Sequence, residues 1–298
     1  MQGDVPVTST FISAPDGLKL HARCWGARAA IGLPVICLPG LARTTADFDA
    51  VAPVLAADGR RVIAIDSRGR GRSEYDRDSA NYNVAVELAD VLAVATALEC
   101  LPAIFIGTSR GGILTMLLAA QRPTAIAGAV LNDVGPVLEP KGLIRIKSYV
   151  GKLPQPSSFE DGGEILRRLF SAQFPKLTAE DWLKSARRTF KEENGRLVPT
   201  YDVDLAKAMQ SYDPEKPIPP LWKEFEAMRN MRVMVIRGAN SDLLSAATVS
   251  AMAERHPNLE SFEVADQGHA PFLAEPETIA RIVSFVLNCL PRNRNAGS

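Results

Sequence analysis

The sequence lacks a surplus of charge of either sign, because 34 lysines and arginines face 34 aspartates and glutamates. Nucleic-acid binding relies on an excess of positive charge that attracts phosphates. The neutral balance therefore argues against a nucleic-acid partner and favours a small molecule as the ligand. Hydrophobic residues make up 46% and charged residues 23% of the 298 positions, which is typical of a globular protein.

Long hydrophobic runs are also missing. The longest apolar stretch, residues 91–106, is interrupted by Glu99 and Pro102 and is too short to cross a bilayer as a helix. Residues 1–13 contain Asp4 and no basic segment followed by an apolar one, so we expect no secretory signal. These absences predict a cytoplasmic protein without a membrane partner.

Cysteine is scarce, and its spacing is not that of a metal site. Cys24, Cys37, Cys100 and Cys289 are scattered, and none forms a C-x-x-C pair. Zinc sites and disulfide frameworks need characteristic spacings, which are absent. Cys37 and Cys289 lie inside apolar runs, as buried reduced thiols do. We therefore predict no metal.

What the sequence does contain is a regular alternation of apolar runs and helical patterns. Apolar runs at residues 35–38, 62–65, 104–106 and 129–131 alternate with helical patterns at residues 47–57, 84–98 and 111–121. Two strands precede them, and the pattern resumes from residue 233 to residue 290. Continuous apolar strands separated by helices predict a parallel sheet with helices on both faces.

Residues 136–231 interrupt this alternation. The stretch is rich in proline and is predicted to form several helices joined by loops, one of them opened by a capping signature from Thr178 to Asp181. Helices inserted into an α/β sheet cover the carboxyl ends of the strands, where ligands bind. We predict a core of residues 1–135 and 232–298 and a helical cap of residues 136–231. Its aromatic residues are expected mainly in the core of the cap: Tyr149, Phe159, Phe170, Phe174, Trp182 and Trp222.

The motif that carries the chemistry is G-x-S-x-G at residues 107–111, between an apolar strand and an apolar helix. A serine on a sharp strand-to-helix turn projects its hydroxyl above the sheet, and glycines relieve the crowding two residues away. The alternative is a glycine-rich connection that only packs the helix on the strand. The flanking strand and helix favour Ser109 as a nucleophile.

A serine nucleophile needs a base, and the chain has three histidines. His21 lies on the polar side of an alternating strand, so we expect an exposed strand residue, and His256 precedes a proline at a helix end, so we expect a C-cap. His269 follows the last strand beside Gly268, at the sheet edge where catalytic groups gather. We predict His269 as the general base.

The base needs a carboxylate that orients it. Asp242 follows the strand at residues 233–236, which gives the chain order Ser, Asp, His. Asp133 is the other candidate for this carboxylate. It follows the apolar run at residues 129–131, the next strand after the one that leads to Ser109. Its alternative role is that of a turn or hinge residue. We expect Asp242 and keep Asp133 as the alternative acid.

The oxyanion of acyl transfer needs two backbone N–H donors. The first is expected from Arg110, directly after the nucleophile. The second is expected from Leu41, where Gly40 lets the backbone approach the site closely.

Five segments, in this order, resemble the α/β-hydrolase superfamily: residues 39–41, 66–73, 107–112, 237–242 and 268–269. Within this superfamily, the sequence most resembles the branch of capped esterases, enol-lactonases and C–C hydrolases. The resemblance implies an eight-stranded, mostly parallel sheet with its second strand antiparallel and a cap inserted after strand 6. It also implies acyl transfer to water through an acyl-enzyme, without metal or organic cofactor.

Two positions depart from the family's usual pattern. Arg110 stands where many relatives carry a small or apolar residue; it either binds an acidic group of the substrate or pairs with a nearby carboxylate. The segment after Asp242 lacks the proline common in relatives. The arginine-rich residues 66–72 suggest a phosphate site, but their match to a family loop favours a structural role, and no nucleotide-binding glycine motif accompanies them.

The sequence thus predicts a serine hydrolase of small carboxylic esters or lactones. Because one fold hosts many chemistries, C–C bond hydrolysis, acyl transfer to another acceptor and cofactor-free peroxidation stay open as alternatives. A ligand receptor with slow turnover on the same fold is the alternative from another class. The sequence does not identify the substrate or the oligomeric state.

Overall fold

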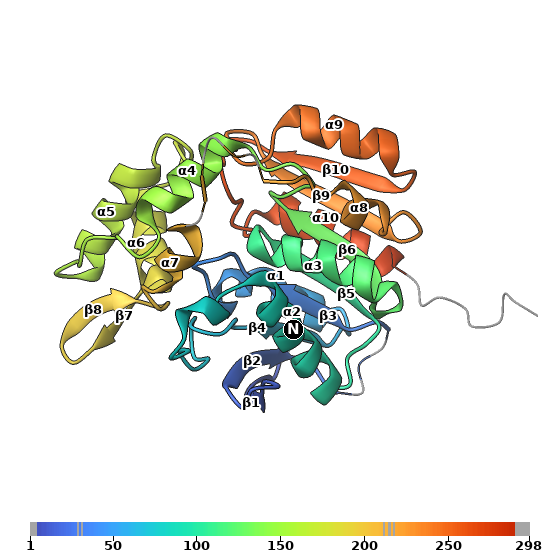
Figure 1. Cartoon of the computed structure of the whole chain (residues 1–298), viewed down its shortest axis with the longest axis horizontal. Coiled ribbons are helices and arrows are strands. Elements are labelled where there is room, and N and C mark those ends of the chain that lie inside the picture. Colours follow the sequence, from blue (N-terminus) through green and yellow to red (C-terminus); the bar gives the residue numbers. More distant parts are fainter. Residues whose placement is uncertain are drawn as a thin grey trace, which may run out of the picture.

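The computed structural model of the chain describes residues 5–28, 30, 32–210, 212–213, 216 and 218–289. An eight-stranded sheet forms its centre in the order β1-β2-β4-β3-β5-β6-β9-β10 (Figure 1). The strands are β1 (Val7–Ser13), β2 (Lys19–Trp25), β3 (Val35–Leu38), β4 (Val62–Ile65), β5 (Ala103–Thr108), β6 (Ile126–Asn132), β9 (Arg232–Gly238) and β10 (Leu259–Val264). β2 pairs antiparallel with β1 and β4, and the other neighbours in this sheet are parallel. The predicted α/β-hydrolase sheet is confirmed.

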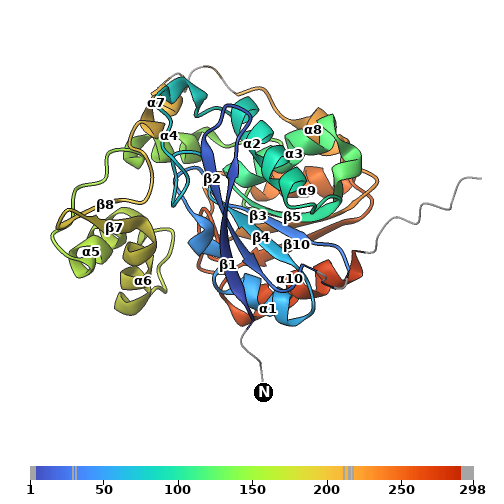
Figure 2. The ribbon, with the colours of Figure 1, turned by 90° about the horizontal axis from the view of Figure 1, so that it is seen from below.

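The strands are apolar throughout because both faces of the sheet are covered. In β3, Ile36 and Leu38 join the hydrophobic core on one face, whereas Val35 and Cys37 join the core on the other. The first face carries α2 (Val84–Ala97), α3 (Arg110–Gln121), α8 (Trp222–Glu226) and α9 (Ala246–Arg255). The second face carries α1 (Val51–Ala57) and α10 (Pro276–Asn288) (Figure 2). Short 3-10 helices are η1 (Thr45–Phe48), η2 (Ser79–Asn81) and η3 (Pro123–Ala125).

A separate group of elements lies beside the sheet and is called the cap below (residues 140–210; Figure 1). It comprises α4 (Pro140–Tyr149), α5 (Phe159–Phe170), α6 (Ala179–Thr189), β7 (Phe190–Glu193), β8 (Arg196–Pro199) and α7 (Leu205–Gln210). α5 and α6 pack around a small apolar core that includes Leu166, Trp182 and Ala186. The predicted capping signature is confirmed, because Thr178 and Asp181 exchange side-chain and backbone hydrogen bonds at the start of α6.

Two features of residues 136–231 differ from the prediction. The segment was expected to be helical, but β7 and β8 form an antiparallel hairpin around Asn194 and Gly195, both at positive φ. An Asn-Gly pair of this kind favours a tight two-residue hairpin turn. α8 packs on α3 of the core, and Phe225 and Met228 belong to the main hydrophobic core. The insertion therefore returns to the sheet before residue 222, earlier than the predicted boundary at 231.

Candidate active site

The sharp turn between β5 and α3 places Ser109 in an unusual backbone conformation. Its φ of 50° and ψ of −111° cost on the order of 1–3 kcal/mol for a residue with a side chain. A Cβ on Gly107 would lie 2.5 Å from the amide nitrogen of Gly112, and one on Gly111 would lie 2.1 Å from the carbonyl oxygen of Leu38. Both glycines are therefore required by close backbone contacts around the serine.

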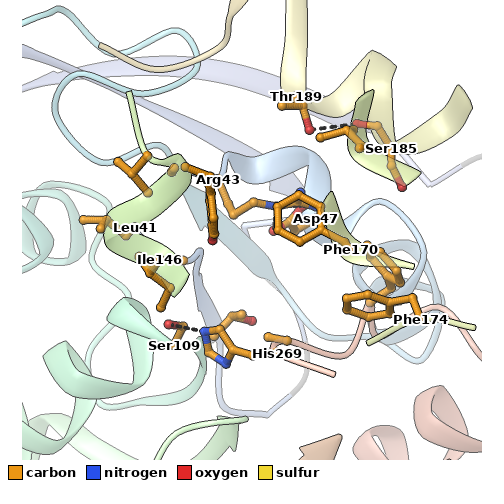
Figure 3. Close-up of a pocket in the computed structure, with 18 of the residues that line it drawn as sticks. Leu41, Arg43, Asp47, Ser109, Ile146, Phe170, Phe174, Ser185, Thr189 and His269 are labelled. Carbon is orange, nitrogen blue, oxygen red and sulfur yellow. Dashed lines mark hydrogen bonds and ion pairs between the residues drawn. The ribbon is translucent and has the colours of Figure 1, made fainter. Parts of the chain in front are cut away.

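The structure brings Ser109 and His269 together, although they are 160 residues apart in the chain. His269 Nε2 lies 2.9 Å from Ser109 Oγ (Figure 3). The imidazole comes from the loop after β10 and is 5% exposed. A short hydrogen bond between a hydroxyl and an imidazole is the geometry that lets the ring accept the hydroxyl proton.

Asp133 supplies the carboxylate that faces this imidazole. Its Oδ2 lies 2.7 Å from His269 Nδ1, and the side chain is fully buried. The carboxylate also accepts hydrogen bonds from the Gly238 amide at 2.7 Å and from Ser241 Oγ at 2.6 Å. Asp133 itself has a φ of 55°, which turns it out of β6 at the edge of the sheet. These contacts hold the carboxylate against one side of the imidazole while the other side faces Ser109.

The expectation that Asp242 orients the histidine is wrong, because Asp133 is the carboxylate that contacts His269 Nδ1. Arg145 of α4 binds the Asp242 carboxylate through two hydrogen bonds, at 2.7 and 2.9 Å. Burial raises the pKa of Asp242, but the hydrogen bonds and charge of Arg145, with smaller contributions from Gln173 and His269, lower it by more, so the pKa lies below its ordinary value. β6 and β9 are neighbours, so both aspartates reach the same sheet edge. Asp133 leaves its strand directly toward the imidazole, whereas Asp242 lies four positions beyond the end of β9 and is held by the cap.

The loop after β3 lies beside the nucleophile, as expected. A Cβ on Gly40 would lie 3.8 Å from the Cβ of Ser109, so this backbone passes close to the serine. Leu41 and Ser109 line the same cavity. The Leu41 carbonyl accepts a 2.8 Å hydrogen bond from Arg70 Nε, which fixes the orientation of this peptide.

Arg110 pairs with a carboxylate, one of the two alternatives that the sequence left open. Its Nε donates a 2.7 Å hydrogen bond to Glu87, whose side chain is 1% exposed. Arg70 Nη1 contacts the other Glu87 oxygen at 2.8 Å. Burial raises the pKa of Glu87, but the two arginines lower it by more, so the net shift is downward. Glu87 therefore links the residue after the nucleophile to the arginine that holds Leu41.

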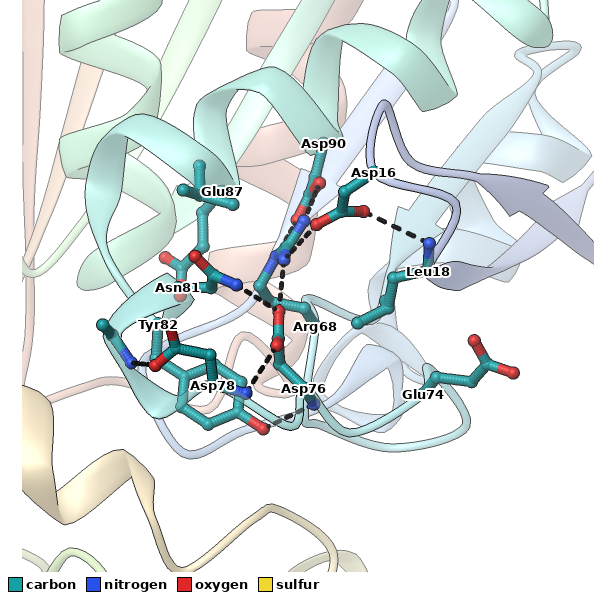
Figure 4. A network of polar contacts seen from close by, with 12 residues as sticks. Asp16, Leu18, Arg68, Glu74, Asp76, Asp78, Asn81, Tyr82, Glu87 and Asp90 are labelled. Atoms are coloured by element: carbon teal, nitrogen blue, oxygen red, sulfur yellow. Dashed lines mark hydrogen bonds and ion pairs between the residues drawn. The ribbon is translucent and has the colours of Figure 1, made fainter.

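The arginine-rich loop at residues 66–73 has the structural role that was favoured. Arg68 is buried and donates to Asp90, Asp16 and Asp76 at 2.6–2.9 Å (Figure 4). The loop also pairs with the cap, because the Gly71 amide donates to the Thr200 carbonyl at 2.7 Å. Since carboxylates occupy the guanidinium of Arg68, this arginine has a structural role in the loop.

The two other histidines lie outside this constellation. His21 is 1% exposed, so the expected exposed strand residue is wrong: its Nδ1 lies 2.7 Å from buried Asp66 and its Nε2 lies 3.1 Å from Ser9 Oγ. The loop at residues 66–73 covers this side of β2 and buries the ring. His256 is the C-cap of α9, as predicted, and its Nε2 donates to the Met228 carbonyl at 3.0 Å.

A cavity of about 130 Å³ opens above Ser109 and His269 and is called the cap pocket (Figure 3). Its walls come from the loop after β3, the loop at residues 270–273 and the cap. Several aromatic residues that were expected mainly in the core of the cap line it: Tyr149, Phe170, Phe174 and Trp182. Phe159 packs on the cap core, and Trp222 lies on α8 against Phe225. The pocket is mainly apolar, with Arg43 and Asp47 as a charged pair in its wall.

Within the described part of the chain, no three His, Cys, Asp or Glu side chains are grouped as metal ligands. The four cysteines are buried and unpaired by disulfides, and burial raises the pKa of Cys100 and Cys289 to about 11. None of the described helices is long and apolar enough to cross a membrane.

Comparisons with known proteins identify the family. Residues 35–282 match the model of the alpha/beta hydrolase family. The chain is 36% identical over 266 residues to a 3-hydroxybutyrate-oligomer hydrolase of Cupriavidus necator, covering 84% of this chain and 87% of that protein. It is 24% identical over 248 residues to a 2-(acetamidomethylene)succinate hydrolase of Mesorhizobium japonicum, covering 83% and 85%.

A solved structure supports the match to the alpha/beta hydrolase family. The crystal structure of an alpha/beta hydrolase from Novosphingobium aromaticivorans superposes with a TM-score of 0.89 at 37% identity and covers 96% of this chain and 99% of that one. The sheet, the serine turn and these relatives lead to one conclusion: the chain belongs to the alpha/beta hydrolase family and is a hydrolase.

Proposed function

We propose that this hydrolase cleaves small carboxylic esters or lactones through an acyl-enzyme formed on Ser109. The observation that carries the proposal is the continuous hydrogen-bonded chain from Ser109 through His269 to Asp133, with contacts of 2.9 and 2.7 Å. In this arrangement the imidazole takes the hydroxyl proton while the carboxylate stabilises the resulting imidazolium. Asp133 therefore replaces Asp242 as the proposed acid.

In the first half of the reaction, Ser109 Oγ attacks the ester carbonyl and His269 Nε2 takes its proton. The backbone N–H groups of Leu41 and Arg110 are the proposed donors to the negative oxygen of the tetrahedral intermediate. Each donor of this kind is typically worth about 3–4 kcal/mol of the barrier. Arg70 supports this role, because it holds the carbonyl of Leu41 and reaches Arg110 through Glu87.

In the second half, the ester C–O bond breaks and His269 gives its proton to the leaving alkoxide. A water molecule then transfers a proton to His269 as its oxygen attacks the acyl carbon. The bond between the acyl carbon and Ser109 Oγ breaks, His269 returns the proton to Oγ, and the acid is released. The apolar walls of the cap pocket surround the reacting groups, which strengthens the electrostatic interactions between them.

Esters of small hydroxy acids are the substrate class we favour. The C. necator relative is named for oligomers of 3-hydroxybutyrate, whose units are joined by ester bonds, and its similarity extends over most of both chains. The cap pocket supports a small group on one side of the ester bond, because a volume of about 130 Å³ has room for only several heavy atoms.

The decisive experiment compares Ser109→Ala with wild type on aryl acetates and on a linear 3-hydroxybutyrate dimer. We expect loss of turnover on both and loss of labelling by a fluorophosphonate, with an unchanged melting temperature. Ser250→Ala, on the exposed side of α9, is the matched control and is expected to behave as wild type. Labelling or turnover that survives in Ser109→Ala would remove the proposed nucleophile.

The same assay separates the remaining alternatives. An acyl burst without steady turnover would favour a slow ligand receptor, and transfer of the acyl group to an added alcohol in preference to water would favour an acyltransferase. Activity on a vinylogous diketone without activity on esters would favour C–C bond hydrolysis.

A further inference from the structure

Ser109 lies between two cavities. The first is the cap pocket. The second is a more open groove of about 560 Å³ whose walls include residues of α3, α4 and α7, called the outer groove below. The two share Leu41, Ser109 and Ile146. An ester bound at Ser109 therefore has one space for each of its halves.

The two cavities differ in the catalytic groups that face them. His269 lines the cap pocket and does not line the outer groove, whereas Arg110 lines the outer groove and does not line the cap pocket. His269 has to protonate the oxygen of the leaving alcohol, so that oxygen must lie on the imidazole side of Ser109. This orientation puts the alcohol half in the cap pocket and the acyl half in the outer groove.

Arg43 gives the cap pocket a cationic group. Its Nε contacts both carboxylate oxygens of Asp47, at 3.1 and 2.9 Å, and its Nη2 contacts one of them at 2.6 Å. Nη1 takes no part in these contacts with Asp47, and the side chain is 31% exposed. Arg43 and Asp47 lie side by side in the wall of the pocket (Figure 3). Asp47 thus holds the guanidinium in place and leaves a donor edge for a ligand.

We propose that the cap pocket is the site of the leaving alcohol and that Arg43 binds a carboxylate carried by that alcohol. The acyl half occupies the outer groove, whose walls include Ile113, Leu138 and Leu143. The substrate class is then an ester whose alcohol half is a hydroxy acid with a free carboxylate. This inference rests on the proposed ester hydrolysis at Ser109.

The orientation decides which bond of an oligomer is cut. In a linear chain of hydroxy acids, the alcohol released by hydrolysis is the part that ends in the free carboxylate. The ester C–O bond next to that unit breaks, the acyl remainder stays on Ser109, and His269 transfers its proton to the released hydroxyl. The small cap pocket admits one unit with its carboxylate at Arg43, so the chain is shortened from its carboxyl end by one unit at a time.

The first test compares a 3-hydroxybutyrate dimer with a free carboxylate and the methyl ester of the same dimer at pH 7.5. Wild type is expected to prefer the free acid in kcat/KM by roughly 10- to 100-fold, because one charge-assisted contact distinguishes the two. Arg43→Met is expected to reduce this ratio to about one, whatever its effect on the absolute rate. Arg122→Met removes the same charge from an exposed position and is expected to retain the wild-type ratio.

Asp47→Asn is the second variant, because it removes the negative partner and keeps Arg43. The preference for the free acid is expected to equal or exceed that of wild type. A ratio near one in wild type, or an unchanged ratio in Arg43→Met, would overturn the assignment of Arg43.

The second test follows a linear trimer labelled with ¹³C in its carboxyl-terminal unit. We expect labelled monomer and unlabelled dimer as the first products, analysed by mass spectrometry. Unlabelled monomer with labelled dimer would overturn the proposed orientation. Ser109→Ala distinguishes a failure of the proposed function from a failure of the present inference. If this variant retains hydrolysis, the proposed function fails. If it is inactive while the wild-type ratios and products contradict the expectation, only the present inference fails.

Discussion

Nδ1 of His269 lies 2.7 Å from the carboxylate of Asp133, which also holds the Gly238 amide and the Ser241 hydroxyl. One carboxylate therefore joins the imidazole to the backbone that follows β9. The same loop carries Asp242, whose carboxylate accepts two hydrogen bonds from Arg145 of the cap. The end of β6 supports the imidazole, and the loop after β9 anchors the cap.

The first prediction separates these two aspartates. Asp133→Asn is expected to lower kcat by about 10⁴-fold, because an amide neither fixes the tautomer of His269 nor stabilises its charged form. Asp242→Asn is expected to lower kcat by roughly tenfold or less, since its hydrogen bonds are with Arg145 and Gln173. Steady-state kinetics on an aryl acetate measures both, and a larger loss in Asp242→Asn would reverse the assignment.

The second prediction concerns the stability that the Arg145–Asp242 pair contributes. Asp242→Asn is expected to lower the free energy of unfolding at pH 7 by about 1–3 kcal/mol, because it weakens two hydrogen bonds between charged groups in a partly buried site. The folded-state pKa of Asp242 lies below the ordinary value of 3.8. The contribution is therefore present above pH 3.8 and is lost as the pH falls through the lower, folded-state value.

Urea unfolding of wild type and Asp242→Asn between pH 7 and pH 3 tests this expectation. The difference between the two proteins is expected to shrink only at the acidic end. A difference that stays constant over this range would show that the ionised carboxylate of Asp242 is not its source.

The third prediction is that Arg70 positions the oxyanion donors. Arg70→Met removes the hydrogen bond to the Leu41 carbonyl and the contact with Glu87, and is expected to lower kcat by roughly 10- to 100-fold with a small change in KM. Wild type is expected to favour an ester over its thionoester, since sulfur is a poorer acceptor from these donors.

The ratio of ester to thionoester rates is the informative measurement for Arg70, because general instability does not alter it. Arg70→Met is expected to reduce this ratio. Arg68→Met, in the same loop but bound to Asp90, Asp16 and Asp76, is the control for lost stability and is expected to retain the ratio. Equal ratios in wild type and Arg70→Met would contradict the positioning role.

The fourth prediction concerns His256, which is held in its neutral form. Its Nδ1 accepts the Asn258 amide at 3.2 Å while Nε2 donates to the Met228 carbonyl, so a second proton has no acceptor. Burial lowers the pKa of His256 below its ordinary value of 6.5. Its stabilising contribution is therefore complete above pH 6.5 and is lost as the pH falls through the lower folded value.

His256→Gln retains a donor for Met228 without a group that titrates in this range. The melting temperature of wild type is expected to fall more between pH 7.5 and pH 5.0 than that of His256→Gln. Parallel curves for the two proteins would contradict a neutral buried imidazole.

Much of the site could be predicted locally. The run of apolar strand, glycine-flanked serine and helix specifies the turn at Ser109, because only glycine fits at positions 107 and 111. His269 could be selected because it is the one histidine that follows the last strand of the pattern. The structure places the two 2.9 Å apart.

The burial of His21 could not be predicted from its strand. The alternation in β2 makes one side polar, and a polar side usually faces water. Here the loop at residues 66–73, more than 40 positions away, covers that side and supplies Asp66 as a partner. The sequence of a strand does not indicate that a charged loop from elsewhere in the chain will cover its polar side.

The sequence by itself determined the sheet, the strained serine turn and the position of the histidine, since these follow from periodicity and from the steric needs of a few adjacent residues. Only the tertiary structure decided between Asp133 and Asp242. Both follow neighbouring strands, and the direction of each side chain depends on the backbone conformation of Asp133 and on the presence of Arg145 in the cap. Such choices depend on contacts between residues 97 to 136 positions apart, which no local pattern encodes.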